Sequence, residues 1–367
     1  MTIDSGPRGL CIIGLLVSAC WLHAADPDLE NWALLKRMQP KGYVCHRAAT
    51  PIKIDGELDD SAWATAPWTE DFQDIQGGAR PAPRFRTRAK MLWDEEFFYI
   101  GAELEEPHVW GTLTKRDSVI FQDNDFEVFI DPNGDNLEYY EFEMNALNTV
   151  WDLFLPKPYK DLGKANNAWD IAGLRTAVHV DGTLNQSNDT DRGWTLEIAF
   201  PWRALAAYAR CVCPPRDGDQ WRVDFSRVEW QIDIVDGHYR KRPGLKEDNW
   251  IWSPPGIVDM HRPERWGYVQ FSTNTTAQAL FRADSTLPVR DLLMGLYYAQ
   301  RSFRAAHGAY ASNVADLAVG PLTLGPKAVI PQIAVTEKGY VVSIEAQVGG
   351  GVRERWHVRE DSRLWHD

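Results

Sequence analysis

Acidic and amide side chains recur at alternating positions in two apolar runs of the sequence. Glu127 lies in the first run, and Glu143 and Asn145 lie in the second. Because side chains alternate between the two faces of a strand, Glu143 and Asn145 share one face of their strand. If the two strands pair with matching faces, Glu127, Glu143 and Asn145 form one polar patch. Such a patch can make charge-assisted hydrogen bonds to a hydroxyl-rich ligand.

A third run adds a guanidinium group and further aromatic rings. Arg227 and Glu229 share one face of this predicted strand, and Trp230 lies on the other. We add Arg227, Glu229 and Trp151 to the candidate binding residues, because aromatic rings stack on the C–H faces of sugars while charged groups bind their hydroxyls. The competing interpretation is that these are solvated side chains on the outside of a β-sandwich, where strand carboxylates usually lie.

The composition excludes several classes of function. Of 367 residues, 44% are hydrophobic and 25% are charged, so the chain can bury a core and is not disordered over most of its length. With 39 Lys and Arg against 52 Asp and Glu, the net charge is −13, which disfavours nucleic acid and anionic lipid as partners. The 17 tryptophans indicate a β-rich core, a stacking surface, or both.

Residues 1–25 are expected to form a secretory signal peptide. Arg8 precedes an apolar run that is too short to cross a bilayer, and small residues follow through Ala25. A buried N-terminal helix is the alternative. Residues 17–20 are also similar to a bacterial lipobox, so lipidation at Cys20 stays open. No other stretch approaches transmembrane length. We therefore expect an exported protein that is periplasmic, extracellular or an outer-membrane lipoprotein, with membrane contact only through Cys20.

Three cysteines lie beyond this segment, at Cys45, Cys211 and Cys213. Outside the cytoplasm, a bridge from Cys45 to either of the other two is permitted, and buried free thiols are the alternative. Three cysteines without a matching histidine spacing make no zinc site.

Short strands separated by Gly, Pro, Asn and Asp dominate the sequence from Ile52 to about Ser272. Only one brief helical stretch, Trp202–Ala209, interrupts them. The pattern predicts a mainly β fold, namely an antiparallel β-sandwich of the immunoglobulin/jelly-roll-like type. The predicted strands are 86–93, 97–104, 126–130, 139–147, 194–200, 221–230 and 267–272.

The pattern changes after the sandwich. Apolar spacing predicts a helix over 287–306 that ends near Gly308, and strand-like runs follow at 329–335 and 340–348. We therefore expect a small C-terminal α+β tail. The predicted organisation, in order, is a signal peptide over 1–25, a lead-in over 26–44, a sandwich over 45–273 and the tail over 278–367.

Five motifs in a fixed order resemble carbohydrate-binding module family 9 and its bacterial relatives. They are Ile54–Asp60 with Trp63, Met91–Asp94 with Phe98–Ile100, Asp123–Asp131, Gly193–Ile198 leading into Pro201–Trp202, and Trp266–Phe271. The resemblance covers roughly residues 45–273. It implies a β-sandwich that binds glycan, typically at a chain end, between two stacked aromatic residues.

The resemblance also implies roles for individual residues. It places the first stacking ring at Phe121, six positions before Glu127, where the best-known pattern of the family has Trp. It places the second ring at Trp252, and core packing is the alternative for both rings. Glu127 and Asn145 stand at the strand glutamate and amide positions. Glu143 stands where the family has an arginine, which reverses a charge in the site.

The charge reversal at Glu143 puts the sugar specificity in doubt. A guanidinium would have to come from a neighbouring strand, and Arg227 is the candidate to supply it.

The resemblance further implies calcium binding. Asp131, Asn133 and Asp135 offer oxygen ligands in one turn, and oxygen ligands suit Ca²⁺. The turn lacks the glycine position and the flanking helices of an EF-hand. An Asx-rich hairpin turn explains the same residues without a metal.

We therefore expect an exported, non-catalytic carbohydrate-binding protein in carbohydrate catabolism, with a glycosidase as a candidate partner. A glycoside hydrolase is the first alternative, because Glu127 and Glu143 can supply two carboxylates about 5–9.5 Å apart. A haem-binding electron-transfer sandwich is the second, with Met144 and His238 as an axial pair, although the sequence has no Cys-x-x-Cys-His motif. A structural module of a cell-surface assembly is the third.

Overall fold

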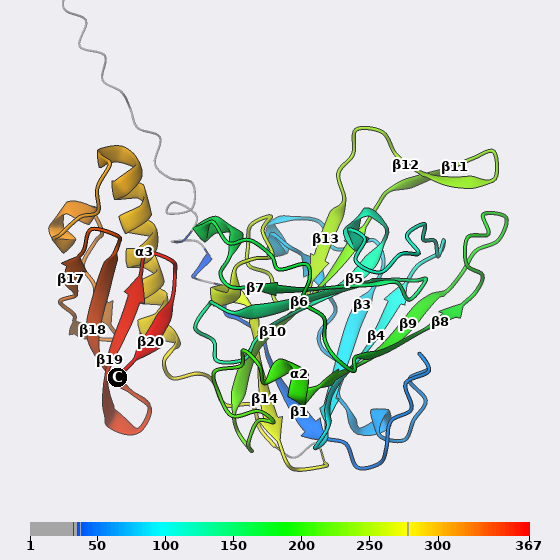
Figure 1. Cartoon of the computed structure of the whole chain (residues 1–367), viewed down its shortest axis with the longest axis horizontal. Helices are drawn as coiled ribbons and strands as arrows, with labels where there is room; N and C mark the ends of the chain where they lie inside the picture. Colours follow the sequence, from blue (N-terminus) through cyan, green and yellow to red (C-terminus); the bar gives the residue numbers. More distant parts are fainter. Residues whose placement is uncertain (1–31, 33–34, 37, 277–278) are drawn as a thin grey trace, which may run out of the picture.

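The computed structural model describes residues 32, 35–36, 38–276 and 279–367, and these residues build two hydrophobic cores. The larger core lies within a body of curled β-sheet, and the smaller lies within the C-terminal unit (Figure 1). The predicted signal peptide and the lipobox cysteine lie outside the described residues. Within the described part of the chain, no helix is both long enough and apolar enough to span a membrane.

The larger body is made almost entirely of strands. They are β1 (Gly42–Arg47), β2 (Gln73–Asp74), β3 (Thr87–Trp93), β4 (Phe97–Glu105), β5 (Asp125–Asp131), β6 (Tyr139–Asn145), β7 (Val150–Leu155), β8 (Arg175–Asp181), β9 (Gly193–Pro201), β10 (Gln220–Glu229), β11 (Ile232–Val235), β12 (His238–Lys241), β13 (Asp248–Ile251) and β14 (Gly267–Ser272). Its short helical turns are η1 (Trp63–Thr65), η2 (Gly77–Ala79), η3 (Ile120–Gln122), η4 (Tyr159–Asp161), α2 (Trp202–Leu205) and η5 (Pro263–Arg265). The predicted mainly β fold is confirmed.

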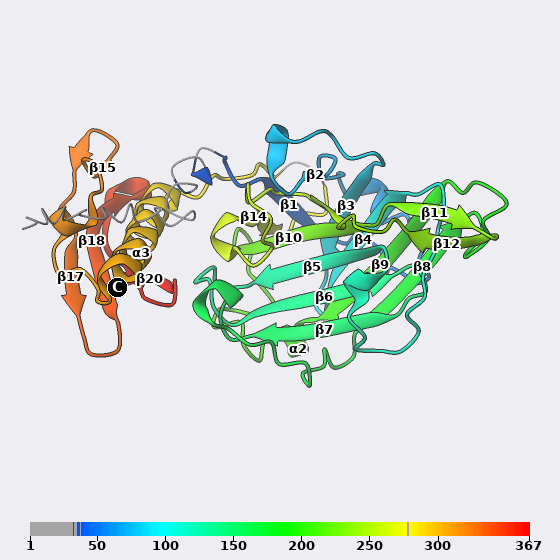
Figure 2. The same cartoon turned by 90° about the horizontal axis from the view of Figure 1, so that it is seen from above.

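One long sheet curls to form both layers of the sandwich. Its strand order is β7-β6-β5-β10-β14-β1-β3-β4-β9-β8, with β13 and β2 attached beside β10. Figure 2 shows β5, β6, β7 and β10 side by side in one layer. The expected antiparallel pairing holds for every pair in this sheet except those of β1, which runs parallel to both β14 and β3. A parallel neighbour needs a long crossover, and residues 48–86 supply it between β1 and β3.

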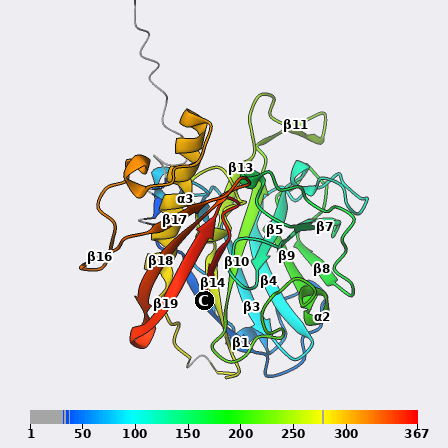
Figure 3. The ribbon, with the colours of Figure 1, turned by 60° about the vertical axis from the view of Figure 1, so that its left-hand side comes forward.

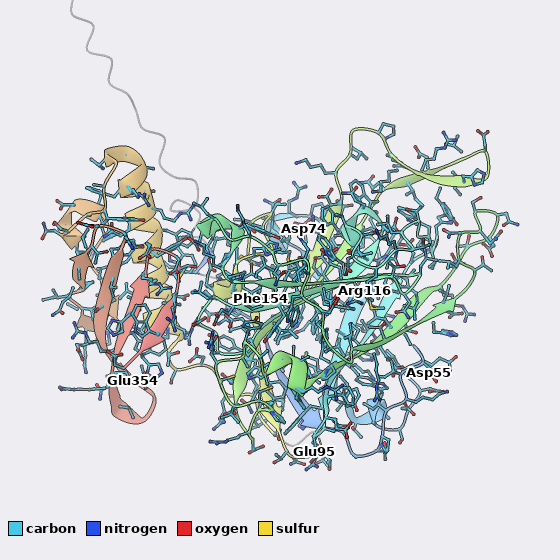
Figure 4. All side chains as sticks on the ribbon, in the orientation of Figure 1. Asp55, Asp74, Glu95, Arg116, Phe154 and Glu354 are labelled. Atoms are coloured by element: carbon cyan, nitrogen blue, oxygen red, sulfur yellow. The ribbon has the colours of Figure 1, made fainter. Side chains whose placement is uncertain are left out.

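Successive side chains along each strand point alternately into the sandwich and to its outer face. Phe126, Val128 and Ile130 of β5 point into the larger core, where they meet aromatic side chains from the opposite layer. The outer face of the same layer carries a separate cluster, which contains Phe129 of β5 and Leu153 of β7. Figure 4 shows the side chains of both bodies, with Phe154 in the larger one. Each of these strands is therefore buried on both faces, which fixes its register.

The C-terminal unit packs one long helix against a small antiparallel sheet (Figure 3). The helix is α3 (Leu287–His307), and it ends at Gly308, whose φ of 75° lies in the left-handed region that favours glycine. Its further elements are η6 (Val314–Leu317), β15 (Thr323–Leu324), β16 (Lys327–Ala328), β17 (Gln332–Val335), β18 (Tyr340–Val348), η7 (Gly349–Gly351), β19 (Val352–Arg359) and β20 (Leu364–His366). The predicted helix and the predicted strand at 340–348 are confirmed.

A buried polar network joins the two bodies. The Tyr297 hydroxyl of α3 donates a hydrogen bond to Asp161, and the Ser362 hydroxyl donates to the other oxygen of the same carboxylate at 2.7 Å. Lys160 lies 3.2 Å from Glu264, which also accepts a hydrogen bond from Tyr298. The side chains of Asp161 and Glu264 are almost completely buried, so each depends on these partners.

We expect Asp161→Ala to lower the free energy of unfolding by roughly 2–5 kcal/mol, because it leaves two buried hydroxyl donors without an acceptor. Urea unfolding followed by tryptophan fluorescence measures this. Asp316→Ala is the matched control, since Asp316 is exposed on the same C-terminal unit. Equal stability of the two variants would show that the network contributes little.

Candidate functional site

A pocket of about 250 Å³ lies on the outer face of the layer that contains β5, β6 and β7. Aromatic rings and carboxylates line it together. The lining residues are Phe121, Glu127, Phe129, Glu141, Glu143, Trp151, Leu153, Tyr159, Val228, Glu247, Asn249, Asp259, Met260 and His261. Three larger hollows, of about 510, 540 and 570 Å³, lie at the C-terminal unit. Within the described residues, none of these three places more than one carboxylate beside an aromatic ring.

The pairing of β5 with β6 brings the two predicted glutamates together. Glu127 lies directly opposite Glu143 in the antiparallel register, as the matching-face interpretation requires. Trp151 lies opposite Glu143 on the next strand, β7. Phe121 of η3 lies at the same pocket, and its backbone N–H donates to Glu143 at 3.0 Å. Four of the eight predicted ligand-binding residues therefore line one pocket.

Two further carboxylates belong to this cluster. Asp125 precedes Glu127 by two residues on β5, and Glu141 precedes Glu143 by two on β6, so each shares a face with a predicted glutamate. Asp125 Oδ1 accepts the backbone N–H of Val228 at 3.1 Å, but its buried Oδ2 has no hydrogen-bond partner. The buried Oε2 of Glu141 has none either. The sequence analysis did not include these two residues among the binding residues. Their spacing of two positions from Glu127 and Glu143 is the signal that could have identified them.

The cluster has unusual protonation behaviour because it is buried. Burial raises the pKa of Glu127 to about 7. Burial also raises the pKa values of Asp125, Glu141 and Glu143 well above their usual range, and the neighbouring carboxylates raise them further. His261, which lies 3.9 Å from Glu141, has its pKa lowered by burial to about 4 and so carries no compensating charge at neutral pH.

The aromatic walls of the pocket come from separate elements. Phe121 belongs to η3, Trp151 to β7 and Tyr159 to η4, and all three side chains are at least partly accessible. The Tyr159 ring packs edge-on against His261, with ring centroids 4.4 Å apart. Sequence reasoning missed Tyr159, because its place beside the pocket depends on the conformation of the loop after β7.

The predicted role of Trp252 as a stacking residue is corrected by its burial. The side chain is 0% exposed and packs in the larger core against Tyr43 and Phe225. Gly267 is required beside it, since a Cβ at that position would lie 2.5 Å from the Trp252 ring. Core packing, the alternative interpretation, describes this residue.

Arg227 and Glu229 face away from the pocket. On β10, the residues opposite Glu127 and Asp125 are Ser226 and Val228, so the intervening Arg227 points to the other face of the strand. There it contacts Glu229 at 2.8 Å and Glu106 at 2.9 Å, and it is 0% exposed. The two residues do share a face, as predicted, but Arg227 does not restore a guanidinium to the pocket. Arg227 lies one position away from Ser226 and Val228 on β10, and successive side chains of a strand point to opposite faces, so its guanidinium lies on the face away from the pocket.

Asn145 is also fully occupied within the protein. Its Nδ2 donates to the Leu113 carbonyl and to Asp123, and its Oδ1 accepts the backbone N–H groups of Leu147 and Thr149. The side chain is 0% exposed. It therefore shapes the connection between β6 and β7 and does not reach the pocket.

The turn predicted to bind calcium contacts the C-terminal unit. Asp131 accepts hydrogen bonds from the backbone N–H groups of Gly134 and Asn136, both at 2.9 Å. Asn133 accepts from the N–H of Asp135 at 3.3 Å. Asp135 accepts from its own loop and also lies 3.2 Å from Arg363. These hydrogen bonds are those of the Asx-turn alternative.

The positions of the side chains also bear on the haem-site alternative and on the permitted disulfide. Met144 points into the larger core, whereas His238 is exposed on the hairpin of β11 and β12, so they do not form the axial pair that a haem site requires. Cys45 is a buried free thiol, and Cys211 and Cys213 are also free, so the permitted disulfide is not formed.

Within the described residues, two groups of carboxylates are spaced closely enough to hold a metal ion. One is Asp125 with Glu127 and Glu143, at the pocket. The other is Asp117 with Asp152 and Asp170, and Arg116 contacts all three of these carboxylates.

Comparison with known proteins agrees with the motif pattern. Residues 54–213 match the family model of the carbohydrate family 9 binding domain-like proteins. Residues 54–213 are therefore similar to this family. This confirms the resemblance predicted from the ordered motifs. The matched segment of this domain includes Phe121, Glu127, Glu143 and Trp151 of the pocket, but ends before β10.

The family 9-like domain is similar to segments of much longer enzymes. It is 34% identical over 161 residues to an endo-1,4-beta-xylanase A from Thermotoga neapolitana, and 25% identical over 161 residues to an exoglucanase XynX from Acetivibrio thermocellus. Each match covers 42% of this chain and 12% of the relative. A solved carbohydrate binding module family 9 from Caldicellulosiruptor kristjanssonii, in complex with cellotriose, aligns with a TM-score of 0.42 at 15% identity, over 65% of this chain and 98% of that chain.

We expect Trp252→Ala to lower the free energy of unfolding by about 3–5 kcal/mol, because it opens a cavity in the core. Trp151→Ala, which truncates a half-buried tryptophan, is the matched control and costs less. Thermal and urea unfolding of both variants measures the difference. A Trp252→Ala variant as stable as the wild type would contradict the core assignment.

The raised pKa of Glu127 predicts a pH dependence of stability. The folded state holds a proton up to about pH 7, whereas an unfolded glutamate releases it near its ordinary pKa of about 4.5. Stability therefore rises as the pH falls from 8 to 5. For this one group the gain is roughly 1–3 kcal/mol. Urea unfolding at several pH values, in a buffer containing a chelator, measures the slope.

Glu127→Gln is the control for this slope. It removes the titrating group with little change of shape, so its stability should depend less on pH over the same interval. Identical slopes for the variant and the wild type would assign the pH dependence to other groups.

Proposed function

We propose that this chain is an exported, non-catalytic carbohydrate-binding protein whose ligand occupies the pocket between Phe121, Trp151 and Tyr159. The observation that carries the proposal is the combination of accessible aromatic rings with carboxylates in one hollow. Aromatic faces stack on the C–H faces of sugar rings, and Glu127 and Glu143 accept hydrogen bonds from hydroxyls. The family 9-like match over residues 54–213 supports the same class of ligand.

The size and charge of the pocket narrow the class of carbohydrate. A hollow of about 250 Å³ suits a short saccharide or the end of a chain better than a long stretch of polysaccharide. Its lining contains five carboxylates, and within the described residues no lysine or arginine lines it. An anionic sugar such as a uronate is therefore disfavoured, and neutral or amine-bearing sugars are the better candidates.

Export is part of the proposal. A basic start, a short apolar run and small residues at 1–25 are typical of secretory signals. The named relatives are polysaccharide-degrading enzymes, which supports a role in carbohydrate catabolism beside a glycosidase.

We expect Trp151→Ala and Phe121→Ala each to weaken saccharide binding about tenfold or more, because each removes a stacking surface. Calorimetry with neutral cello-, xylo- and manno-oligosaccharides and with amine-bearing glucosamine oligomers measures the affinities. Trp68→Ala is the matched control, since the Trp68 ring packs against Arg88 and Lys90 and does not line the pocket.

The same samples separate the rival functions. Release of reducing sugar from the oligosaccharides, lost in Glu127→Gln, would replace the binding proposal with a glycoside hydrolase. The absence of binding to every oligosaccharide, by a folded protein, would favour the assembly-module alternative. Normal binding by both pocket variants would place the site elsewhere.

A further inference from the structure

Three clustered carboxylates, of which Glu127 and Glu143 line the pocket, have no cationic side chain paired with them among the described residues. Asp125, Glu127 and Glu143 are 0%, 5% and 2% exposed, and one oxygen of each lies within 4.8 Å of the others. Within the described part of the chain, no lysine or arginine forms an ion pair with any of the three. Buried charges of like sign are costly, so these groups hold protons unless a cation takes the place of those protons.

Some of the other buried carboxylates of this protein do have cationic partners. Arg116 contacts Asp152 and its two neighbours, and Lys160 contacts Glu264. Glu229 is paired with Arg227. The fold thus supplies cations to some buried carboxylates elsewhere but, in the part of the chain that the structure describes, to none of these three.

Unused oxygens provide a second observation at the same place. Asp125 Oδ2 belongs to the group and has no hydrogen-bond partner, although it is completely buried. Glu141 is 5% exposed, lines the same pocket, and has its Oε2 buried without a partner. Buried acceptors without donors are rare in native proteins, and a bound ion or water is one explanation for them.

We propose that Asp125, Glu127 and Glu143 bind a divalent cation of the calcium class at the base of the pocket, with Glu141 beside them. Ca²⁺ takes six to eight oxygen ligands at about 2.3–2.6 Å, so oxygens that share one ion lie within about 5 Å of each other. The spacing of the three carboxylates meets this condition. Mg²⁺ demands near-ideal octahedral geometry and keeps several waters, which an irregular set of strand carboxylates suits less well.

This site differs from the turn at Asp131, Asn133 and Asp135, whose oxygens are already hydrogen-bonded. It is built by the register of two strands, since Glu127 and Glu143 are opposite one another on β5 and β6. The pocket leaves the remaining coordination positions open to water or to a ligand. The proposal does not rest on carbohydrate binding, because the cation would neutralise the protein's own side chains.

Calorimetry of the full chain, stripped with a chelator and titrated with CaCl₂ or MgCl₂, tests the proposal. We expect one equivalent of Ca²⁺ to bind more tightly than Mg²⁺, and Ca²⁺ to raise the melting temperature. Glu143→Gln and Asp125→Asn should each weaken Ca²⁺ binding at least tenfold and abolish the shift in melting temperature.

Two measurements keep the result interpretable. Asp170→Asn is the control, because Asp170 belongs to the other acidic group, where Arg116 already supplies a positive charge. It should bind Ca²⁺ as the wild type does. Circular dichroism in the chelator shows whether each variant is folded, and the isosteric changes at Asp125 and Glu143 remove uncompensated charge, so both should fold.

The proposal is overturned if the stripped wild-type protein shows neither heat nor a melting shift with either cation. It is also overturned if both pocket variants keep the wild-type affinity, or if Asp170→Asn loses as much affinity as they do. Tighter binding of Mg²⁺ would overturn the calcium assignment. Saccharide titrations in the chelator, run separately, report on the carbohydrate proposal alone.

Discussion

The antiparallel register of β5 and β6 is the constraint on which the functional surface depends. Their inward side chains, such as Phe126 and Phe142, close the larger core, so neither strand can slip by one residue without burying charge there. The outward side chains are then fixed by geometry, with Glu127 opposite Glu143. The same apolar pattern that stabilises the sandwich therefore concentrates carboxylates at one point on its outside.

Buried carboxylates at the interface between the two bodies have different partners from those at the pocket. Across the interface between its two bodies, carboxylates such as Asp161 and Glu264 are satisfied by hydroxyls and cations. Lys160 and Arg262 lower the pKa of Glu264 although burial alone would raise it. At the pocket, among the described residues, no lysine or arginine pairs with Asp125, Glu127 or Glu143, and burial dominates their pKa values. A structural interface needs permanent neutralisation, whereas a site for an incoming ligand is better served by groups that are still unpaired.

The C-terminal unit packs against loops of the larger body and occupies polar groups of those loops. Its docking uses oxygens and loops that in an isolated sandwich would face solvent, including Asp135, which contacts Arg363. Residues that look like metal ligands in the sequence are thereby assigned to packing. The loops that carry Tyr159 and His261 lie next to this interface, since Lys160 and Arg262 take part in it. The pocket and the docking interface therefore share their supporting loops.

The sequence by itself determined the mainly β class, about half of the strand positions and the C-terminal helix, because these follow from local periodicity. It indicated that Glu127 and Glu143 could share a patch, but the pairing of β5 with β6 decided that they do. It did not determine which tryptophan is accessible: Trp252 is buried and Trp151 is half-buried. It also did not determine the parallel placement of β1, or which face of β10 carries Arg227 relative to the pocket. Those outcomes depend on which strands become neighbours and how the curled sheet closes. Contacts between residues distant in the sequence decide them, and only the tertiary structure contains those contacts.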